Sequence, residues 1–215
     1  MGNLKQDNTL SLVPTGLTVT SERREDRLAA NESRFESGID SSEAAAILGL
    51  DPVRTSLDIW HEKRGLLTQP EVPLDQDEGR VSWQFILEPL VAAVYSKRTG
   101  NPIKRVSKTM RHPAYPWMGA AVRWEVGLPE VQLLHCLQVH AREMYLWQKG
   151  VPEHSFVDLQ HLLVVTGQRA VDVVVLEGGK SVRILRVERD GVLIERLIEA
   201  EAQFWGYVER GRVPA

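Results

Sequence analysis

Few residues in the apolar stretches of this chain have side chains that could do chemistry. One apolar stretch contains Arg123 and Glu125, and the next contains His135. A hard ion such as Mg²⁺ requires several oxygen ligands, which these two stretches do not supply. His135, together with Glu88 and His112, suits a softer ion such as zinc or manganese. The same three residues equally suit a packed and hydrogen-bonded interior, so both interpretations stay open.

Size and charge are those of one ordinary globular domain. The chain has 215 residues, of which 43% are hydrophobic, and this length is enough for one sizeable core. Residues 1–34 are polar and show little periodicity, so we expect a flexible arm there and a single domain over 35–215. The formal charge of -3 gives no global basic signature. Any surface for nucleic acid must therefore be a local patch.

The cysteine content and the hydropathy indicate a compartment. The one cysteine, Cys136, lies in an apolar run, as expected of a buried thiol in a reduced, cytoplasmic protein without disulfides. The sequence has no basic and apolar leader at its start, and no apolar run approaches the ~18 residues that span a bilayer. We therefore expect a soluble protein that has no membrane contact.

Hydrophobic periodicity and capping residues predict five helices. They begin and end at the following residues: Asp40 (with Glu43 as a capping box) to Gly49, Thr55 or Ser56 to Gly65, Trp83 to Thr99, Ser155 to Gly167, and about Leu193 to Arg210. Pro89 lies inside the third, which indicates either a start near Leu87 or a kink. The last helix is amphipathic and is followed by Gly211.

Runs of β-branched and apolar residues predict the strands. They are Gly119–Val126, Val131–Val139, Ala170–Leu176 and Val182–Val187, the last two flanking a Gly178-Gly179 turn. The segment Arg111–Met118, which contains two prolines, is expected to be a connector. The first two strands should be neighbours. Helices, strands, a helix, strands and a final helix in this order predict an α/β fold with a mixed central sheet flanked by helices.

Several ordered segments resemble the motifs of one nuclease family. They are IDSSEAAAILGLDPVRTSLDIWHEK (39–63), WQFILEP (83–89), HPAYPWMGA (112–120), LQHLLVVTG (159–167) and FWGYV (204–208). With these segments, most of the chain resembles the YqaJ-type viral recombinases and lambda exonuclease, which belong to the PD-(D/E)xK nuclease superfamily. The resemblance implies a restriction-endonuclease-like core.

The resemblance also implies where the catalytic residues should be, and this sequence departs from the pattern there. The family's metal-binding Asp and Glu fall on Arg123 and His135, and its Lys falls on Leu137, whereas a helix Glu and a later Gln are kept as Glu88 and Gln160. Two anions are lost and a fixed guanidinium is gained, so a hard divalent ion should not bind. We expect no metal and no other cofactor, with Mg or Mn required only if the chain is an active enzyme. Arg123 is expected to replace the ion and to pair with Glu88.

The parts of the family pattern that bind a DNA end are better kept. The phosphate-binding Ser corresponds to Ser42 at a helix N-terminus, and Arg34 and Arg54 are the accompanying cationic candidates. Each of these residues equally suits a plain cap or a surface charge. Since the family often assembles as a ring around DNA, the resemblance implies a homotrimer in a bacterial or phage-infected cell.

Three functions are compatible with the sequence. The first is an inactive relative of phage exonucleases that binds duplex DNA ends or a partner in recombination. The second is an active, metal-dependent 5′-to-3′ exonuclease with displaced ligands, for which Glu125 is the nearest substitute although it lies ~6–7 Å along the strand. The third is an interaction module that uses the nuclease fold against a host nuclease or defence factor. The altered positions favour the first function and a protein that is not an enzyme.

Overall fold

A computed structural model of the chain describes residues 38–66, 83–127, 133–139 and 141–214. The expected arm over 1–34, including Arg34, lies outside the described residues. The helices and strands follow one another as β1 (Ile39–Asp40), η1 (Ser41–Glu43), α2 (Ala44–Ile47), α3 (Ser56–Lys63), α4 (Trp83–Thr99), β2 (Ile103–Arg111), β3 (Met118–Val126), β4 (Leu133–Val139), η3 (Ala141–Trp147), α5 (Glu153–Thr166), β5 (Ala170–Glu177), β6 (Ser181–Glu188) and α6 (Gly191–Arg210).

The strands form one mixed sheet, as the sequence predicts. Its order is β1-β3-β4-β5-β6, and β2 pairs with β3 in addition. The pairs β2/β3, β3/β4 and β5/β6 are antiparallel, whereas β1/β3 and β4/β5 are parallel. The parallel connection from β4 to β5 runs through η3 and α5, which places a helix against the sheet, as a parallel crossover requires.

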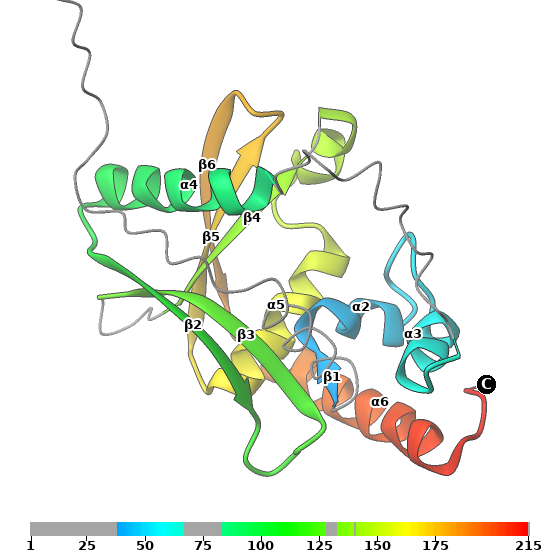
Figure 1. The fold of residues 1–215 in the computed structure, drawn as a ribbon. Helices are drawn as coiled ribbons and strands as arrows, with labels where there is room; N and C mark the ends of the chain where they lie inside the picture. Colours follow the sequence, from blue (N-terminus) through cyan, green and yellow to red (C-terminus); the bar gives the residue numbers. More distant parts are fainter. Residues whose placement is uncertain (1–37, 67–82, 128–132, 140, 215) are drawn as a thin grey trace, which may run out of the picture.

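Helices cover both faces of the sheet at β4 and β5 (Figure 1). Val171, Val173 and Val175 of β5 share a hydrophobic cluster with α5, whereas Val174 and Leu176 share a second cluster with α4. Because successive side chains of a strand point to opposite faces, the two helices must lie on opposite sides of β5. Burial on both faces explains why β5 is almost continuously apolar in sequence.

The predicted helix ends are largely confirmed. Asp40 and Glu43 form the expected capping box at η1, and Thr55 caps α3 with Asp58 as its partner. Gly167 (φ 67°) and Gly211 (φ 63°) adopt the left-handed conformation after α5 and α6, which glycine tolerates best. These local signals were sufficient because they depend on neighbouring residues alone.

The predicted bounds of α4, Trp83 to Thr99, are confirmed, whereas one prediction about its surroundings was wrong. The helix does not start near Leu87: it begins at Trp83 and continues through Pro89, which costs one backbone hydrogen bond. The strand β2 was not predicted, and only Arg111 of this strand had been placed in a connector. Most of its described side chains are exposed, so it lacks the apolar pattern that reveals a strand in sequence.

Buried ionisable groups join the helices to each other and to the sheet. The imidazole of His161 on α5 contacts the Gly119 carbonyl of β3 at 2.9 Å and Glu201 of α6 at 2.7 Å. Desolvation opposes protonation of His161, but the Glu201 carboxylate and both hydrogen bonds outweigh it, so its pKa is raised. Lys63 of α3 lies 2.8 Å from Glu43 of η1, and both side chains are almost fully buried. Four helical segments, α5 with α6 and α3 with η1, are thus held in two pairs by ionisable groups.

Asp158 of α5 is a third buried acid, and it accepts a hydrogen bond from the Ala45 N–H at 3.0 Å. Burial raises the pKa of Asp158 to about 7, and the charges of Asp51 and Asp40 act in the same direction, against the Ala45 hydrogen bond. The folded protein therefore holds a proton on this group at a pH where the unfolded chain has lost it. This contribution to stability is present below about pH 4 and is lost as the pH rises through about 7, by roughly 4 kcal/mol at most.

We expect the stability of Asp158→Asn relative to the wild type to increase from pH 5 to about pH 7 and to stay constant above that pH. Asparagine cannot ionise, and its Oδ1 accepts the same Ala45 hydrogen bond. Urea unfolding of both proteins between pH 5 and pH 8.5 gives the difference in free energy of unfolding, in which other titrating groups largely cancel. A difference that stays constant across this range would contradict the prediction.

Candidate functional site

The central strand β3 has an interruption in its pairing. On one edge it pairs with β2 from Gly119 to Val126, with a register shift on the way. On the other edge β1 pairs at Met118 and Gly119, and β4 pairs at Trp124 and Glu125. The stretch 120–123 lies between these two partners, and we call it the pairing gap. Side chains from β1, β3, β4 and α4 meet beside it.

Glu88 and Arg123 form an ion pair at the β4 side of the pairing gap. The Arg123 Nη1 donates to Glu88 Oε2 at 3.0 Å, and the Trp124 Nε1 donates to Glu88 Oε1 at 3.2 Å. The Glu88 side chain is only 7% exposed, whereas that of Arg123 is 36% exposed. A buried carboxylate requires a cation and hydrogen-bond donors, and both of its oxygens have one here. The predicted pair between Arg123 and Glu88 is confirmed.

His135 of β4 is close to the same ion pair. Burial and the positive charge of Arg123 together lower the pKa of His135 to about 4, against the carboxylate of Asp40, which raises it. His135 is therefore a neutral imidazole at neutral pH. Leu137 lies two residues further along β4, paired with Val175, and only its backbone belongs to the described part of the chain.

Ser42 lies just after β1, on the other side of the pairing gap from β4. Its hydroxyl donates to Asp40 Oδ1 at 3.1 Å, and its backbone N–H donates to the same oxygen at 3.2 Å. Ser42 is exposed. Arg54 lies further along the chain, before α3, where its Nη2 is 2.6 Å from Glu62 Oε2. Of the two predicted phosphate-binding residues that the structure describes, Ser42 directly follows β1, and Arg54 is engaged by a carboxylate.

Gln160, in the middle of α5, has structural contacts. Its Nε2 donates to the Glu188 carbonyl and its Oε1 accepts from the Asp190 N–H, both at 2.8 Å. The side chain is fully buried, so Gln160 joins α5 to the turn between β6 and α6. The sequence pattern that marks it as retained does not reveal these contacts.

The softer metal site is not assembled. The Nδ1 of His112 accepts from the Ala114 and Tyr115 N–H groups, at 3.2 and 3.1 Å, and its ring stacks on Tyr115. Among residues 38–66, 83–127, 133–139 and 141–214, no group of three His, Cys, Asp or Glu side chains is arranged to hold a metal ion. Glu88 and His112 instead make hydrogen bonds with groups of the protein.

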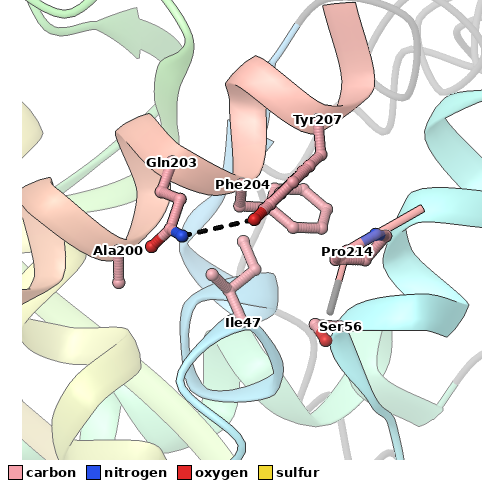
Figure 2. A pocket seen from close by; sticks show the side chains of 7 residues that line it. All are labelled: Ile47, Ser56, Ala200, Gln203, Phe204, Tyr207 and Pro214. Atoms are coloured by element: carbon pink, nitrogen blue, oxygen red, sulfur yellow. Dashed lines mark hydrogen bonds between the residues drawn. The ribbon is translucent and has the colours of Figure 1, made fainter. Parts of the chain in front are cut away.

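A separate pocket of about 150 Å³ lies between α2, α3 and α6 (Figure 2). Its lining consists of Ile47, Ser56, Ala200, Gln203, Phe204, Tyr207 and Pro214. The Gln203 amide donates to the Tyr207 hydroxyl at 3.3 Å along one face of α6. This lining contains no carboxylate, imidazole or amine, so it offers no metal ligand and no general base that works near neutral pH. The pairing gap remains the candidate site.

Two residues of the site were missed from the sequence. Trp124 follows Arg123 in the strand, and period-two alternation places its side chain away from Arg123; only the length of the arginine lets both reach Glu88. Asp40 was identified as a cap, but its effect on His135 requires β1 and β4 to lie beside the same strand. Neither contact has a signal in local sequence.

The split mixed sheet, with α4 and α5 on its two faces, is a restriction-endonuclease-like core. Solved structures with this fold include an alkaline exonuclease (LHK-Exo) from Laribacter hongkongensis, with a TM-score of 0.66 and 19% identity over 87% of this chain and 93% of that one. A phage-related exonuclease from Haemophilus somnus 129PT has a TM-score of 0.51 and 11% identity over 84% and 97% of the two chains. At these identities the likeness shows the fold alone.

The chain belongs to the YqaJ-like viral recombinase domain family, which matches residues 32–169. It is also 33% identical over 184 residues to the uncharacterized protein YqaJ of Bacillus subtilis (strain 168). The match covers 83% of this chain and 56% of the relative, so the chain spans little more than half the length of that protein. The resemblance seen in the sequence motifs is therefore confirmed at the level of the family.

We expect Arg123→Ala to lower the free energy of unfolding by about 1–3 kcal/mol, because Glu88 would keep a buried charge without its cation. Glu88→Gln in the same chain removes that charge and should restore part of the loss. Urea unfolding of the wild type, both single variants and the double variant measures the coupling. Equal destabilisation in Arg123→Ala and in the double variant would contradict the assignment of the pair.

Proposed function

We propose that this protein is a family member that does not cleave DNA and that binds duplex DNA ends, in association with recombination. The observation that carries the proposal is the ion pair between Arg123 and Glu88, at 3.0 Å. The resemblance to the family places Arg123 where a metal-binding Asp is expected. A guanidinium at that position supplies a positive charge beside the sheet without a metal ion.

The side chains at the gap do not fit a hard divalent ion. Glu88 is the carboxylate that the family pattern retains, and its two oxygens already accept from Arg123 and Trp124. His135 is a neutral nitrogen ligand, which Mg²⁺ does not prefer. Glu125, the nearest substitute for a displaced ligand, is 2.7 Å from Lys108 Nζ. These contacts disfavour the active exonuclease.

The proposal uses Arg123 and Ser42 as groups that contact phosphate. Arg123 is about one-third exposed and has N–H donors besides the one that contacts Glu88, so a second N–H is available to donate to a phosphate oxygen. The Ser42 hydroxyl lies on the opposite side of the pairing gap. Arg34 and Arg54 complete the proposed end-binding set. In this proposal three copies form a ring around DNA in the cytoplasm of a bacterial or phage-infected cell. Among the described helices, none is long and apolar enough to cross a membrane.

An interaction module is the second candidate, and one observation favours it. Leu50, Val53 and Leu57, in and after the connection between α2 and α3, are 36%, 85% and 40% exposed. Apolar side chains gathered on one connection can contact another protein, such as a recombination partner, a host nuclease or a defence factor. Gel shifts at increasing salt separate the two functions, because phosphate contacts weaken steeply with salt and apolar contacts do not.

We expect the wild type to leave 5′-phosphorylated linear duplex DNA intact in the presence of Mg²⁺ or Mn²⁺. We also expect it to bind this DNA, as measured by a gel shift with EDTA present. The physical reason is that Arg123 supplies the cation that a nuclease takes from the metal. A denaturing gel of the end-labelled strand measures cleavage, and covalently closed duplex is the control for end preference. Digestion that Glu88→Ala abolishes would show instead that the chain is an active nuclease.

Restoring the family pattern should restore cleavage. We expect the variant Arg123→Asp, His135→Glu, Leu137→Lys to digest linear duplex in a Mg²⁺-dependent manner, because the carboxylates then supply oxygen ligands beside Glu88. Adding Glu88→Ala to this variant is the matched control and should abolish the gain. A triple variant that folds and binds DNA as the wild type does, yet cleaves none of it, would contradict a loss confined to these three positions.

A further inference from the structure

The strand β2 carries a concentration of positive charge that the proposed function does not use. Its nine residues include four cations, Lys104, Arg105, Lys108 and Arg111, and no acid. All four residues are exposed. In the described part of the chain β2 pairs only with β3, so it lies at an edge of the sheet (Figure 1). Because the whole chain has a net charge of -3, this charge is local.

Two of these four cations, Lys104 and Arg105, have no acid beside them among the described residues. Lys108 Nζ lies 2.7 Å from Glu125 Oε1, and Arg111 donates to the Pro116 carbonyl at 3.0 Å. Within the ranges that the structure describes, no carboxylate lies within 4.0 Å of the charged groups of Lys104 or Arg105. These two cations are therefore open to an anionic partner in solvent.

A chain of contacts links this strand to the candidate site. The Arg105 guanidinium lies over the Trp124 ring, 6.0 Å from its centroid, and Trp124 Nε1 donates to Glu88 at 3.2 Å. Arg123 contacts the other oxygen of Glu88. Positive groups thus lie on both sides of the Trp124 and Glu88 pair. Of the cations of β2, Arg105 is thus linked to the candidate site through Trp124.

We infer that the exposed edge of β2 binds the phosphate backbone of duplex DNA, independently of any DNA end. From Lys104 to Arg111 the strand extends roughly 23 Å at ~3.3 Å per residue, which corresponds to about seven base pairs at 3.4 Å each. Flexible lysine and arginine side chains on such a strand can reach several phosphates of one groove edge. The inference rests on the proposed function for the ligand, and it adds a second contact region that recognises no terminus.

Lysines on an edge strand also prevent strand pairing between copies. That role predicts a change in association when they are removed and no change in DNA affinity. The two explanations are therefore distinguished by measuring both properties on the same variants.

The experiment uses the full chain and a fluorescent duplex closed at both ends by hairpin loops, with EDTA present. Fluorescence anisotropy gives the affinity between 50 and 300 mM salt for the wild type and for the variant Lys104→Gln, Arg105→Gln. The variant Arg196→Gln, Arg212→Gln is the matched control: it removes the same charge from exposed residues outside the sheet. Light scattering reports association, and thermal unfolding reports folding. The single variant Lys104→Gln tests the inference if the double variant does not fold.

We expect the β2 variant to bind the closed duplex more weakly and to lower the slope of log affinity against log salt by about 1 per cation removed, while the control keeps the wild-type slope. Equal slopes in the two double variants would overturn the inference, as would a wild type that does not bind the closed duplex. The proposed function fails differently, by cleavage or by the absence of any preference for a free 5′-phosphorylated end. If the β2 variant binds the closed duplex more weakly and the wild type prefers a free 5′-phosphorylated end, the results support both the inference and the proposed function.

Discussion

The packing of α4 on the sheet depends on neutralising one buried carboxylate. Glu88 faces β3 from within a helix whose neighbouring residues Val91, Ala92 and Tyr95 form the apolar contact with the sheet. Without a cation, the desolvation cost of Glu88 would oppose that contact. In a metal-dependent nuclease an ion could offset this cost, and here Arg123 does so from the neighbouring strand. A substitution at Glu88 or Arg123 is therefore expected to change the stability of the packing of α4 on the sheet as well.

The sequence was sufficient for the parts of the fold that local patterns define. The Asp40 capping box, the valine run of β5 and the glycines after α5 and α6 each report on their own neighbours. The pairing of Arg123 with Glu88 could be anticipated because the family pattern places both residues beside one ion. Strand β2 could not, since an exposed edge strand needs no apolar alternation. For Gln160 the sequence motif was recognised, but a motif does not reveal the hydrogen-bond partners of its residues.

Fold and chemistry are separable in this protein. The scaffold keeps the buried network of His161, Glu201 and the Gly119 carbonyl, which joins α5 and α6 to the central strand. That network does not include Arg123, His135 or Leu137, so the shape of the sheet need not depend on the side chains at these positions. Function must therefore be argued from the residues beside the pairing gap, because the same fold supports different uses.

Strand β1 has a consequence for the order of folding. It contributes only the residues Ile39 and Asp40, and its partner Met118 lies 79 positions after Ile39 (118 minus 39). Closing so long a loop for two residues of pairing is entropically costly, whereas β2 and β3 are connected by a short segment. We expect β1 to dock after the β2/β3 hairpin has formed and to detach before the sheet unfolds. Strand β1, which borders the pairing gap, and the adjacent Ser42 would then unfold locally before the rest of the sheet.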